Sequence, residues 1–226
     1  MGLNKSKGNM YDWVTHTWNT VKGECYHNCV YCYMKNWGDL AKVRFDEKEL
    51  QTDLGKGNII FVGNTNDMFA QDIPFEWIEK TMEHCRKHDN EYVFQTKNPK
   101  RLTMFFQGKV DLRYTVGTTI ETNRADDLAK ISKAPPPEER AKWIAMGNDK
   151  KFITIEPIMD FDLEPFAEMI ANAKPNFVNI GADSKRHNLH EPSYEKVIAL
   201  VDALKSTGIE IRKKINLQRL NGNAST

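Results

Sequence analysis

Short runs of apolar residues recur along the chain and alternate with longer segments in which apolar and polar positions follow a helical period. Gly, Asn or Pro bounds most of the apolar runs, and most are apolar at successive positions, as in strands buried on both faces. The pattern predicts strands at His16–Lys22, Asn58–Val62, Glu91–Gln95, Tyr114–Thr119, Lys151–Glu156, Asn176–Ile180 and Ile209–Arg212. Such strands are typical of a parallel sheet.

The intervening segments have the periodicity of amphipathic helices. Pro74, Pro99 and Pro192 stand where first-turn prolines are tolerated, and Gly208 follows the last segment as a stop. Six strand–helix units and one further strand indicate an α/β fold, either a doubly wound sheet or a full or partial barrel; both place chemistry at the carboxyl ends of the strands. The predicted helices are Cys32–Asp39, Pro74–Lys87, Pro99–Phe106, Glu138–Met146, Leu163–Asn172 and Ser193–Ser206.

Length and composition narrow the class of protein further. A chain of 226 residues with 40% hydrophobic and 28% charged residues is ordinary for one globular domain. The formal net charge of +1 gives no overall field that attracts a polyanion, so any such site has to be a local patch. No apolar run has the length of a membrane helix and no secretory leader is visible, so we expect a cytoplasmic protein without a membrane partner.

Three of the four cysteines lie within eight residues, directly after the first predicted strand. Cys25, Cys29 and Cys32 have the spacing C-x3-C-x2-C, and clustered cysteines of this kind indicate a metal or redox site rather than a disulfide framework. Thiolates select iron–sulfur clusters or zinc, and three ligands would leave one iron of a cubane open. With His27 as a fourth ligand, the same segment could hold a structural zinc ion instead.

Further motifs agree with the cysteine spacing. Tyr31 precedes the third cysteine, and polar blocks follow the next strands at residues 61–69 (FVGNTNDMF), 95–99 (QTKNP), 117–120 (GTTI) and 155–157 (IEP). Together these motifs resemble the radical S-adenosylmethionine (radical SAM) superfamily, and within it a phage- and bacteria-associated subgroup of uncharacterised function, distantly similar to spore photoproduct lyase. The resemblance covers residues 13–217 of an expected single domain, 1–226. It implies a partial (βα)6 TIM-like barrel with an extra C-terminal strand.

The resemblance also implies the chemistry. Cys25, Cys29 and Cys32 would hold one 4Fe–4S cluster, whose open iron binds S-adenosyl-L-methionine (SAM). An electron from a flavodoxin- or ferredoxin-type donor would cleave SAM reductively to methionine and a 5′-deoxyadenosyl radical, which abstracts hydrogen from a substrate. The phage association and the open side of a partial barrel favour DNA or a nucleotide as that substrate.

The first strand-end block is assigned to SAM by the same resemblance. The superfamily usually carries a Gly-Gly-Glu-like segment after the second strand, and here Gly63, Asn64, Thr65 and Asp67 occupy that place. Because the glutamate is absent, backbone carbonyls with Asn64 or Asp67 would bind the SAM amino group. The alternative is a polar turn after a buried strand. Tyr31, beside the cluster, would contact the cofactor.

The later blocks supply the remaining candidates. Gln95 and Lys97 follow the third strand, and Lys97 could neutralise the SAM carboxylate, although a solvated lysine is the alternative. Thr119 and Glu121 could bind the ribose hydroxyls. Glu156 ends the fifth strand, where this architecture places function. Lys97 and Glu156 are therefore the catalytic candidates.

Other functions are compatible with the sequence. A zinc-stabilised binding module would have no catalysis, and an accessory protein would bind cluster and SAM without forming 5′-deoxyadenosine. Cys85 shares a predicted helical face with Ile78 and Met82, which indicates a core residue, and the four cysteines suffice for a single cluster.

Overall fold

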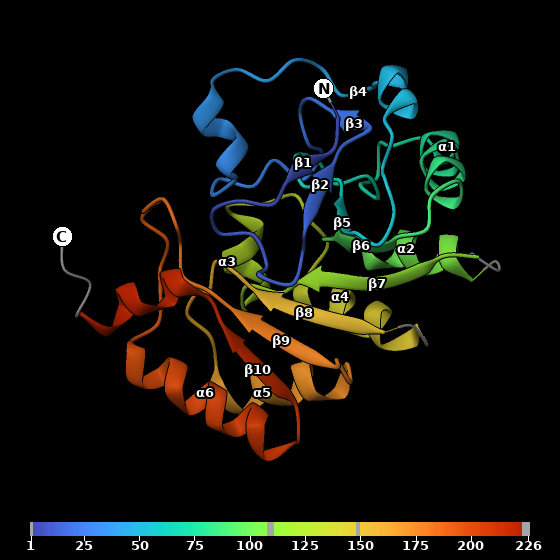
Figure 1. The fold of residues 1–226 in the computed structure, drawn as a ribbon. Helices are drawn as coiled ribbons and strands as arrows, with labels where there is room; N and C mark the ends of the chain where they lie inside the picture. Colours follow the sequence, from blue (N-terminus) through green and yellow to red (C-terminus); the bar gives the residue numbers. More distant parts are fainter. Residues whose placement is uncertain (1, 108–110, 148–149, 223–226) are drawn as a thin grey trace.

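The computed structural model describes residues 2–107, 111–147 and 150–222, and its central feature is one eight-stranded sheet (Figure 1). The strand order is β1-β2-β5-β6-β7-β8-β9-β10, and all neighbouring pairs are parallel except β1 with β2. The strands are β1 (Asn4–Lys5), β2 (His16–Trp18), β5 (Ile59–Val62), β6 (Glu91–Thr96), β7 (Arg113–Thr119), β8 (Lys151–Ile155), β9 (Phe177–Ile180) and β10 (Glu210–Lys213).

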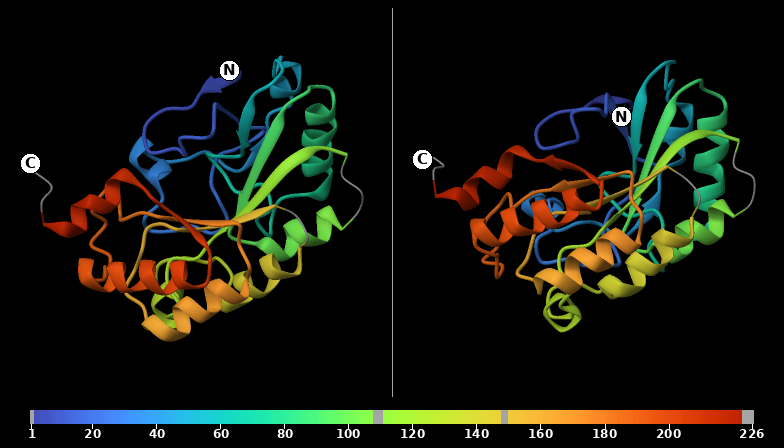
Figure 2. Two further views of the ribbon diagram at one scale, coloured as in Figure 1. Left: turned by 60° about the horizontal axis from the view of Figure 1, so that its bottom comes forward. Right: turned by 90° about the horizontal axis from the view of Figure 1, so that it is seen from below.

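Helices cover the outer, convex face of the curved sheet (Figure 2). Because β1 and β10 are the two edges of the sheet, the barrel is open on one side. This confirms the predicted partial barrel with a strand after the last helix. The helices are α1 (Phe75–Arg86), α2 (Pro99–Phe106), α3 (Ala125–Ala129), α4 (Pro137–Met146), α5 (Leu163–Asn172) and α6 (Tyr194–Ser206), with 3₁₀ helices η1 (Tyr33–Trp37), η2 (Glu47–Gln51) and η3 (Ile215–Asn221).

Two predicted elements differ from the structure. The strand expected at His16–Lys22 is broken: the chain leaves the main sheet after Trp18, and β3 (Val21–Lys22) pairs antiparallel with β4 (Arg44–Phe45) in a small second sheet. The helix expected at Cys32–Asp39 is only the 3₁₀ helix η1, which has no buried residue. Since most helical stability in proteins comes from packing an apolar face, this segment lacks what would extend the helix.

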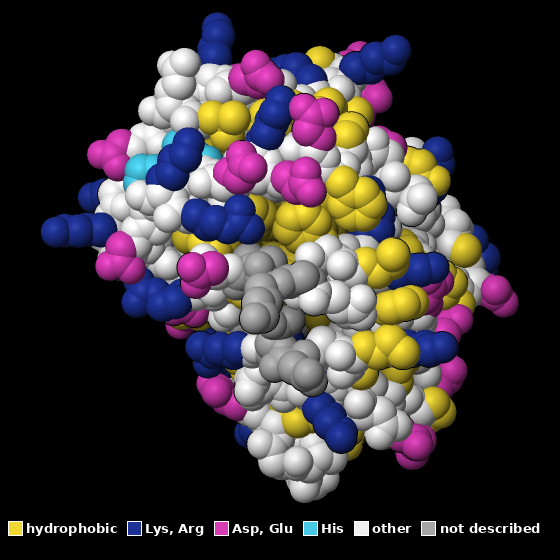
Figure 3. All heavy atoms as spheres, turned by 90° about the vertical axis from the view of Figure 1, so that its right-hand side faces the viewer, with side chains coloured by type: hydrophobic (Ala, Val, Ile, Leu, Met, Phe, Trp, Pro, Cys, Tyr) yellow, Lys and Arg dark blue, Asp and Glu magenta, His cyan; other side chains and the backbone are white. Residues whose placement is uncertain are grey.

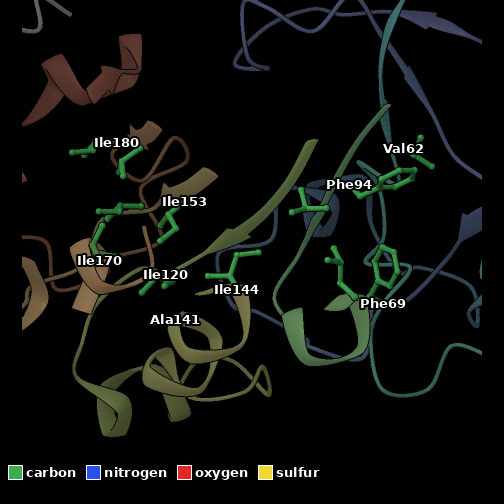
Figure 4. Packing of buried hydrophobic residues seen from close by; sticks show 14 of the residues in the cluster. Val62, Phe69, Phe94, Ile120, Ala141, Ile144, Ile153, Ile170 and Ile180 are labelled. Atoms are coloured by element: carbon green, nitrogen blue, oxygen red, sulfur yellow. The ribbon is translucent and has the colours of Figure 1, made fainter. Parts of the chain in front are cut away.

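The main hydrophobic core lies between the sheet and its helices. Side chains alternate across a strand, so in β8 Ile153 and Ile155 face the helices while Phe152 faces the inside of the curve. Figure 4 shows Ile153 in this core together with Ile144 of α4 and Ile170 of α5, all of them buried. Burying each such side chain contributes about 1.5–3 kcal/mol, so this layer holds the barrel wall in place.

The segment that precedes β2 packs against the inner face of the sheet. The rings of Tyr11 and Trp13 are stacked with centroids 5.6 Å apart. Tyr11 meets Phe152 edge-on at 5.5 Å, and Trp13 meets Phe177 edge-on at 5.7 Å. The apolar pattern did not predict this packing, because the segment belongs to no strand or helix. It fills the inside of the half barrel with aromatic rings.

The opposite end of the molecule carries a mixed surface. Figure 3 shows the side at which the strands begin, where hydrophobic side chains lie between acidic and basic ones. The exposed large hydrophobic residues of α1, α2 and α4 are Phe75, Met104 and Met146. Among the described residues, no helix has the length and apolar character needed to cross a bilayer.

Gly117 in β7 is expected to tolerate no side chain. A Cβ at this position would lie 2.3 Å from the ring of Phe152 on the neighbouring strand. We predict that Gly117→Ala lowers the free energy of unfolding by about 1–3 kcal/mol through overpacking, measured by urea denaturation. Gly2→Ala is the control, since its nearest neighbour would be Thr52 Cγ2 at 3.9 Å.

The clash is specific to one ring, so a second substitution tests it. Gly117→Ala with Phe152→Leu is expected to lose less stability than the sum of the two single changes. A Gly117→Ala protein as stable as Gly2→Ala would contradict the packing described for the inner face.

Candidate functional site

The three clustered cysteines lie in one long loop, here called the cysteine loop (residues 23–43), which leaves and rejoins the structure at the β3–β4 sheet. The backbone N–H of Glu24 donates to the carbonyl of Ala41 at 2.8 Å and closes the base of the loop. Gly23 has φ +99°, and a Cβ there would lie 2.5 Å from the carbonyl oxygen of Ala41. The base therefore requires glycine at this position.

A cavity of about 1400 Å³ lies between the cysteine loop and the carboxyl ends of the strands. Every residue predicted for the site lines it, with the exception of Glu121. The structure thus brings together Cys25, Cys29, Cys32, Tyr31, Gly63, Asn64, Thr65, Asp67, Gln95, Lys97, Thr119 and Glu156, which come from five separate parts of the chain.

The thiols share this cavity but differ in surroundings. Cys29 is buried, and its Sγ lies 3.1 Å from the hydroxyl of Ser132. Burial raises the pKa of Cys25 to about 12, and the carboxylate of Asp67 adds to that rise. Three thiols that line one cavity match the donor set that an iron–sulfur cluster with an open corner needs. Among the residues that the structure describes, however, no three His, Cys, Asp or Glu side chains are already gathered around one point as metal ligands.

His27, the alternative zinc ligand, pairs with Asp67. Its Nε2 lies 2.8 Å from Oδ2 of Asp67, and its Nδ1 is buried without a hydrogen-bond partner. Asp67 also accepts from the hydroxyl of Thr96 at 2.9 Å, the backbone N–H of Lys97 at 2.8 Å and that of Phe69 at 3.0 Å. Burial alone would raise the pKa of Asp67, but His27 and these donors lower it. Asp67 therefore ties the cysteine loop to the ends of β5 and β6.

Glu121 is the one predicted residue that does not reach the cavity. Its side chain is 0% exposed and lies between Lys97 Nζ at 3.0 Å and Arg140 Nη1 at 2.8 Å, and it also accepts from the hydroxyl of Tyr31. The structure therefore does not bring Thr119 and Glu121 together at the cavity: Thr119 lines it, whereas Glu121 lies behind its wall. Burial acts to raise the pKa of Glu121, but Arg140 and Lys97 outweigh it and lower the pKa to about 2.

The block after β5 is held by residues that the sequence reading missed. Asn19 donates to Asn64 Oδ1 at 2.8 Å and accepts from the backbone N–H of Thr65 at 3.0 Å. Asn66 donates to the carbonyls of Gly23 and Glu24 at 3.0 and 2.9 Å, at the base of the cysteine loop. No sequence signal separates these asparagines from ordinary turn residues, because both act through partners distant in the chain.

The floor of the cavity is a polar network on the inner face of the sheet. The hydroxyl of Tyr11 donates to Gln95 Oε1 at 2.7 Å and lies 2.6 Å from Thr154 Oγ1. Gln95 Nε2 donates to Thr119 Oγ1 at 2.9 Å. Strand alternation could have pointed to Thr154, which lies two residues before Glu156 on the same face. Tyr11 carried no such signal.

Glu156 lines the same cavity directly after β8. Its carboxylate accepts from Lys214 Nζ, Asn216 Nδ2 and Asn9 Nδ2, each at 2.7 Å. A Cβ at Gly181 would lie 2.7 Å from Oε1 of Glu156, so the glycine leaves room for this carboxylate. Glu156 joins the end of β8 to segments near both ends of the chain; its catalytic role stays a prediction.

Comparison with solved structures finds a similar fold in spore photoproduct lyase and in SuiB. A spore photoproduct lyase mutant with bound AdoMet and dinucleoside spore photoproduct matches with a TM-score of 0.57 and 13% identity, over 90% of this chain and 64% of that chain. A second spore photoproduct lyase mutant gives 0.61 and 12%, over 90% and 78%. SuiB of Streptococcus suis bound to S-adenosylmethionine gives 0.56 and 11%, over 93% and 53%.

These likenesses concern the fold, and the chain spans less than two thirds of the first of these structures. No family model and no curated protein matches the sequence. The phage-associated subgroup and the single-domain organisation stay predictions.

The network around Glu121 predicts a pH dependence of stability. A carboxyl with a lowered folded-state pKa stabilises the fold above its ordinary pKa of 4.5, and that contribution disappears as the pH falls towards about 2. The free energy of unfolding falls as the pH is lowered from 6 to 3. We expect this fall to be about 2–3 kcal/mol smaller in Glu121→Gln than in the unmodified protein. Urea denaturation at both pH values measures the difference.

Glu138→Gln provides the comparison, because Glu138 is an exposed residue at the start of α4. It should keep the pH dependence of the unmodified protein. Parallel stability profiles for Glu121→Gln and the unmodified chain would show that Glu121 is not held as a carboxylate.

Proposed function

We propose that this protein is a radical SAM enzyme that uses one 4Fe–4S cluster to cleave SAM reductively. The observation that carries the proposal is that Cys25, Cys29 and Cys32, from a single loop, line the cavity at the carboxyl ends of a parallel half barrel. Structures of this fold bind AdoMet in spore photoproduct lyase and S-adenosylmethionine in SuiB. The donor set and the position of the cavity fit the same use.

When bound, the cluster and SAM would supply a 5′-deoxyadenosyl radical that abstracts hydrogen from substrate, with the electron coming from a flavodoxin- or ferredoxin-type donor. The chain's own part is to bind and orient. Lys97 and Arg140 are two cations around the single carboxylate of Glu121, so the buried network has an excess positive charge. Lys97 is the member that lines the cavity, and we assign it to the SAM carboxylate.

The remaining contacts proposed for SAM come from other residues that line the cavity. The turn at Gly63, Asn64 and Thr65 offers backbone carbonyls to the SAM amino group, with Gly63 at φ +84°. Gln95 and Thr119 present an amide and a hydroxyl from the floor, where they are already fixed to each other. Fixed polar groups of this kind orient a ligand without reorganising as it binds.

The central test is anaerobic reconstitution with iron and sulfide, followed by SAM and dithionite, with chromatography for 5′-deoxyadenosine. We expect the unmodified chain to form it and Cys29→Ala to lose it, because removing one of three thiolates removes a cluster ligand. Cys85→Ala is the matched control: Cys85 is buried in α1, away from the loop, and its removal should leave the product.

Metal analysis separates the competing functions. One zinc and no iron in the reconstituted protein would favour the zinc-stabilised binding module. A cluster-bearing protein that forms no 5′-deoxyadenosine would favour the accessory role, and product formation by Cys29→Ala would overturn the cluster assignment.

For the substrate we propose a nucleotide unit of a nucleic acid. Two exposed aromatic side chains of the cysteine loop line the cavity, Tyr26 by 45% and Tyr33 by 44% exposed. A third, Trp37, is 80% exposed and directly precedes Gly38, which lines the cavity. Exposed aromatic rings stack on bases, and lysines around them bind phosphates. The spore photoproduct lyase structure with a bound dinucleoside supports the same class of substrate.

Charge at the cavity agrees with this substrate. Three acidic residues line the cavity without an ion pair among the described residues: Glu24, Asp39 and Asp72. More lysines than this line the cavity and likewise have no ion pair among the described residues. This local excess supplies the patch that the net charge of +1 does not. The lysines are Lys7, Lys35, Lys42, Lys133 and Lys185.

Trp37→Ala is predicted to weaken binding of a labelled single-stranded oligonucleotide. Loss of one stacked base costs about 1–3 kcal/mol, so affinity should fall roughly 5- to 150-fold in fluorescence anisotropy. Phe75→Ala is the matched control, since Phe75 is 46% exposed on α1, outside the cysteine loop. Equal affinity of Trp37→Ala and Phe75→Ala would remove the support for stacking at the cysteine loop.

A further inference from the structure

Tyr31 lies between two of the clustered cysteines in the sequence, and its hydroxyl forms a hydrogen bond within the protein. It donates to Glu121, a carboxylate with no exposure to solvent, and Arg140 Nη1 bonds the other carboxylate oxygen at 2.8 Å. Arg140 is also 0% exposed. Neither Glu121 nor Arg140 lines the cavity, so neither is placed to touch a ligand there.

Arg140 makes further contacts that reach the cysteine loop by a second route. Its Nη1 donates to the carbonyl of Thr119 at 2.9 Å, at the end of β7, and its Nε donates to the carbonyl of Pro135 at 2.6 Å. Pro135 belongs to the proline-rich connector between α3 and α4, residues 134–137. Three consecutive prolines restrict the backbone of this connector, so fixing one of its carbonyls fixes its course.

The residues just before the connector hold the cysteine loop directly. The backbone N–H of Val30 donates to the carbonyl of Ile131 at 2.8 Å, and that of Lys133 donates to the carbonyl of His27 at 2.7 Å. Between them, Ser132 Oγ lies 3.1 Å from Cys29 Sγ. The loop is therefore attached along its central part to a segment whose far end Arg140 holds.

We propose that Glu121 and Arg140 are positioning residues that form, with Tyr31, a buried strut. The strut ties the cysteine loop and the proline connector to the end of β7 and so holds the three thiols in place before a cluster binds. The inference deepens the proposed function, since it concerns the loop that would carry the cluster. It gives Glu121 a structural task in place of the ribose contact, and it assigns a task to Arg140, which no sequence motif singled out.

The geometry of the strut requires these residue types. Arginine has a planar fork that can bond a carboxylate and two carbonyls at once, whereas lysine has a single ammonium. Breaking a buried ion pair leaves an uncompensated charge, so Glu121→Gln is a severe change. Tyr31→Phe is mild, because it removes one hydroxyl and keeps the ring and both charges.

The test measures thiol alkylation in the full-length chain purified without metal. Iodoacetamide labelling is followed by peptide mass spectrometry at two cysteines: Cys29, buried in the loop, and Cys85, buried in the core. Release of the loop exposes Cys29 alone, whereas global unfolding exposes both. We expect Tyr31→Phe and Arg140→Lys each to accelerate labelling of Cys29 roughly tenfold or more, the scale of a lost hydrogen bond to a charged group, with Cys85 unchanged.

Two controls match the variants. Tyr92→Phe also removes a buried tyrosine hydroxyl, which donates to the carbonyl of Cys85 at 2.8 Å, and Asp160→Asn disrupts another ion network, with Arg124 at 2.6 Å and Lys196 at 2.7 Å. Neither touches the cysteine loop, so neither should change the labelling rate of Cys29. If Arg140→Lys does not fold, Tyr31→Phe decides the question.

Unchanged labelling of Cys29 in Tyr31→Phe overturns the strut, and so does equal acceleration at Cys29 and Cys85. The double variant Tyr31→Phe with Glu121→Gln should accelerate labelling by less than the product of the two single effects, because both changes weaken the same Tyr31–Glu121 contact. Fully multiplicative effects would also overturn the proposal. The measurement uses neither cluster nor SAM. A chain that forms no 5′-deoxyadenosine would therefore refute the proposed function and leave the strut to be judged by the labelling alone.

Discussion

A carboxylate shielded from water between two cations is the interaction on which the rest of this site depends. Glu121 bonds Lys97, Arg140 and Tyr31, and its side chain is 0% exposed. In such an environment an ion is stable only when every partner is present, so the four side chains hold one another in a single arrangement. They come from the cysteine loop and from the regions of β6, β7 and α4, and their joint fixation sets where the loop meets the barrel. The His27–Asp67 pair anchors the same loop to the ends of β5 and β6. The two buried carboxylates, Glu121 and Asp67, thus fix the position of the loop that carries the three cysteines.

The sequence was sufficient for the framework of the barrel because that framework is built from local periodicity. The bounds predicted for Pro99–Phe106 and Leu163–Asn172 agree with the structure at both ends, and the central strands agree within a residue or two. The exceptions occur where local periodicity does not decide. The segment 32–39 has a helical composition but no buried face, and the strand from His16 breaks because its second half pairs with β4 across the cysteine loop. Tyr11 is 84 positions from Gln95 and fills the inner face from outside any regular element. Its place depends on tertiary packing that no window of the sequence contains.

The same distinction explains where the candidate site residues lie in the structure. The rule that parallel strands present function at their carboxyl ends gathered nearly all of the candidates around one cavity. It gives the end of the sheet, but it does not say whether a side chain beyond the strand turns into the cavity or behind it. Thr119, still within β7, keeps the inward direction of its strand, whereas Glu121, two residues later, has turned towards Arg140. Arg140 itself appears in the sequence as an ordinary charged residue of an amphipathic helix, and only its three-dimensional partners reveal that it is buried.

The open edge of the barrel explains why the cysteine loop needs the contacts of the buried carboxylates. The sheet ends at β1 and β10, and both edges carry charged residues, Lys5 on one and Glu210, Arg212 and Lys213 on the other, which disfavour pairing with another strand. A barrel that stays open gains access for a large substrate but loses the closure that would brace its loops. The cysteine loop therefore needs bracing from within, and the buried carboxylates of Asp67 and Glu121 supply it. The aromatic packing of Tyr11 and Trp13 fills the inner face of the sheet. A loop held by buried contacts beside an open edge suits the radical reaction on a nucleic acid that we propose, because the reacting groups must be held still while the substrate enters from solvent.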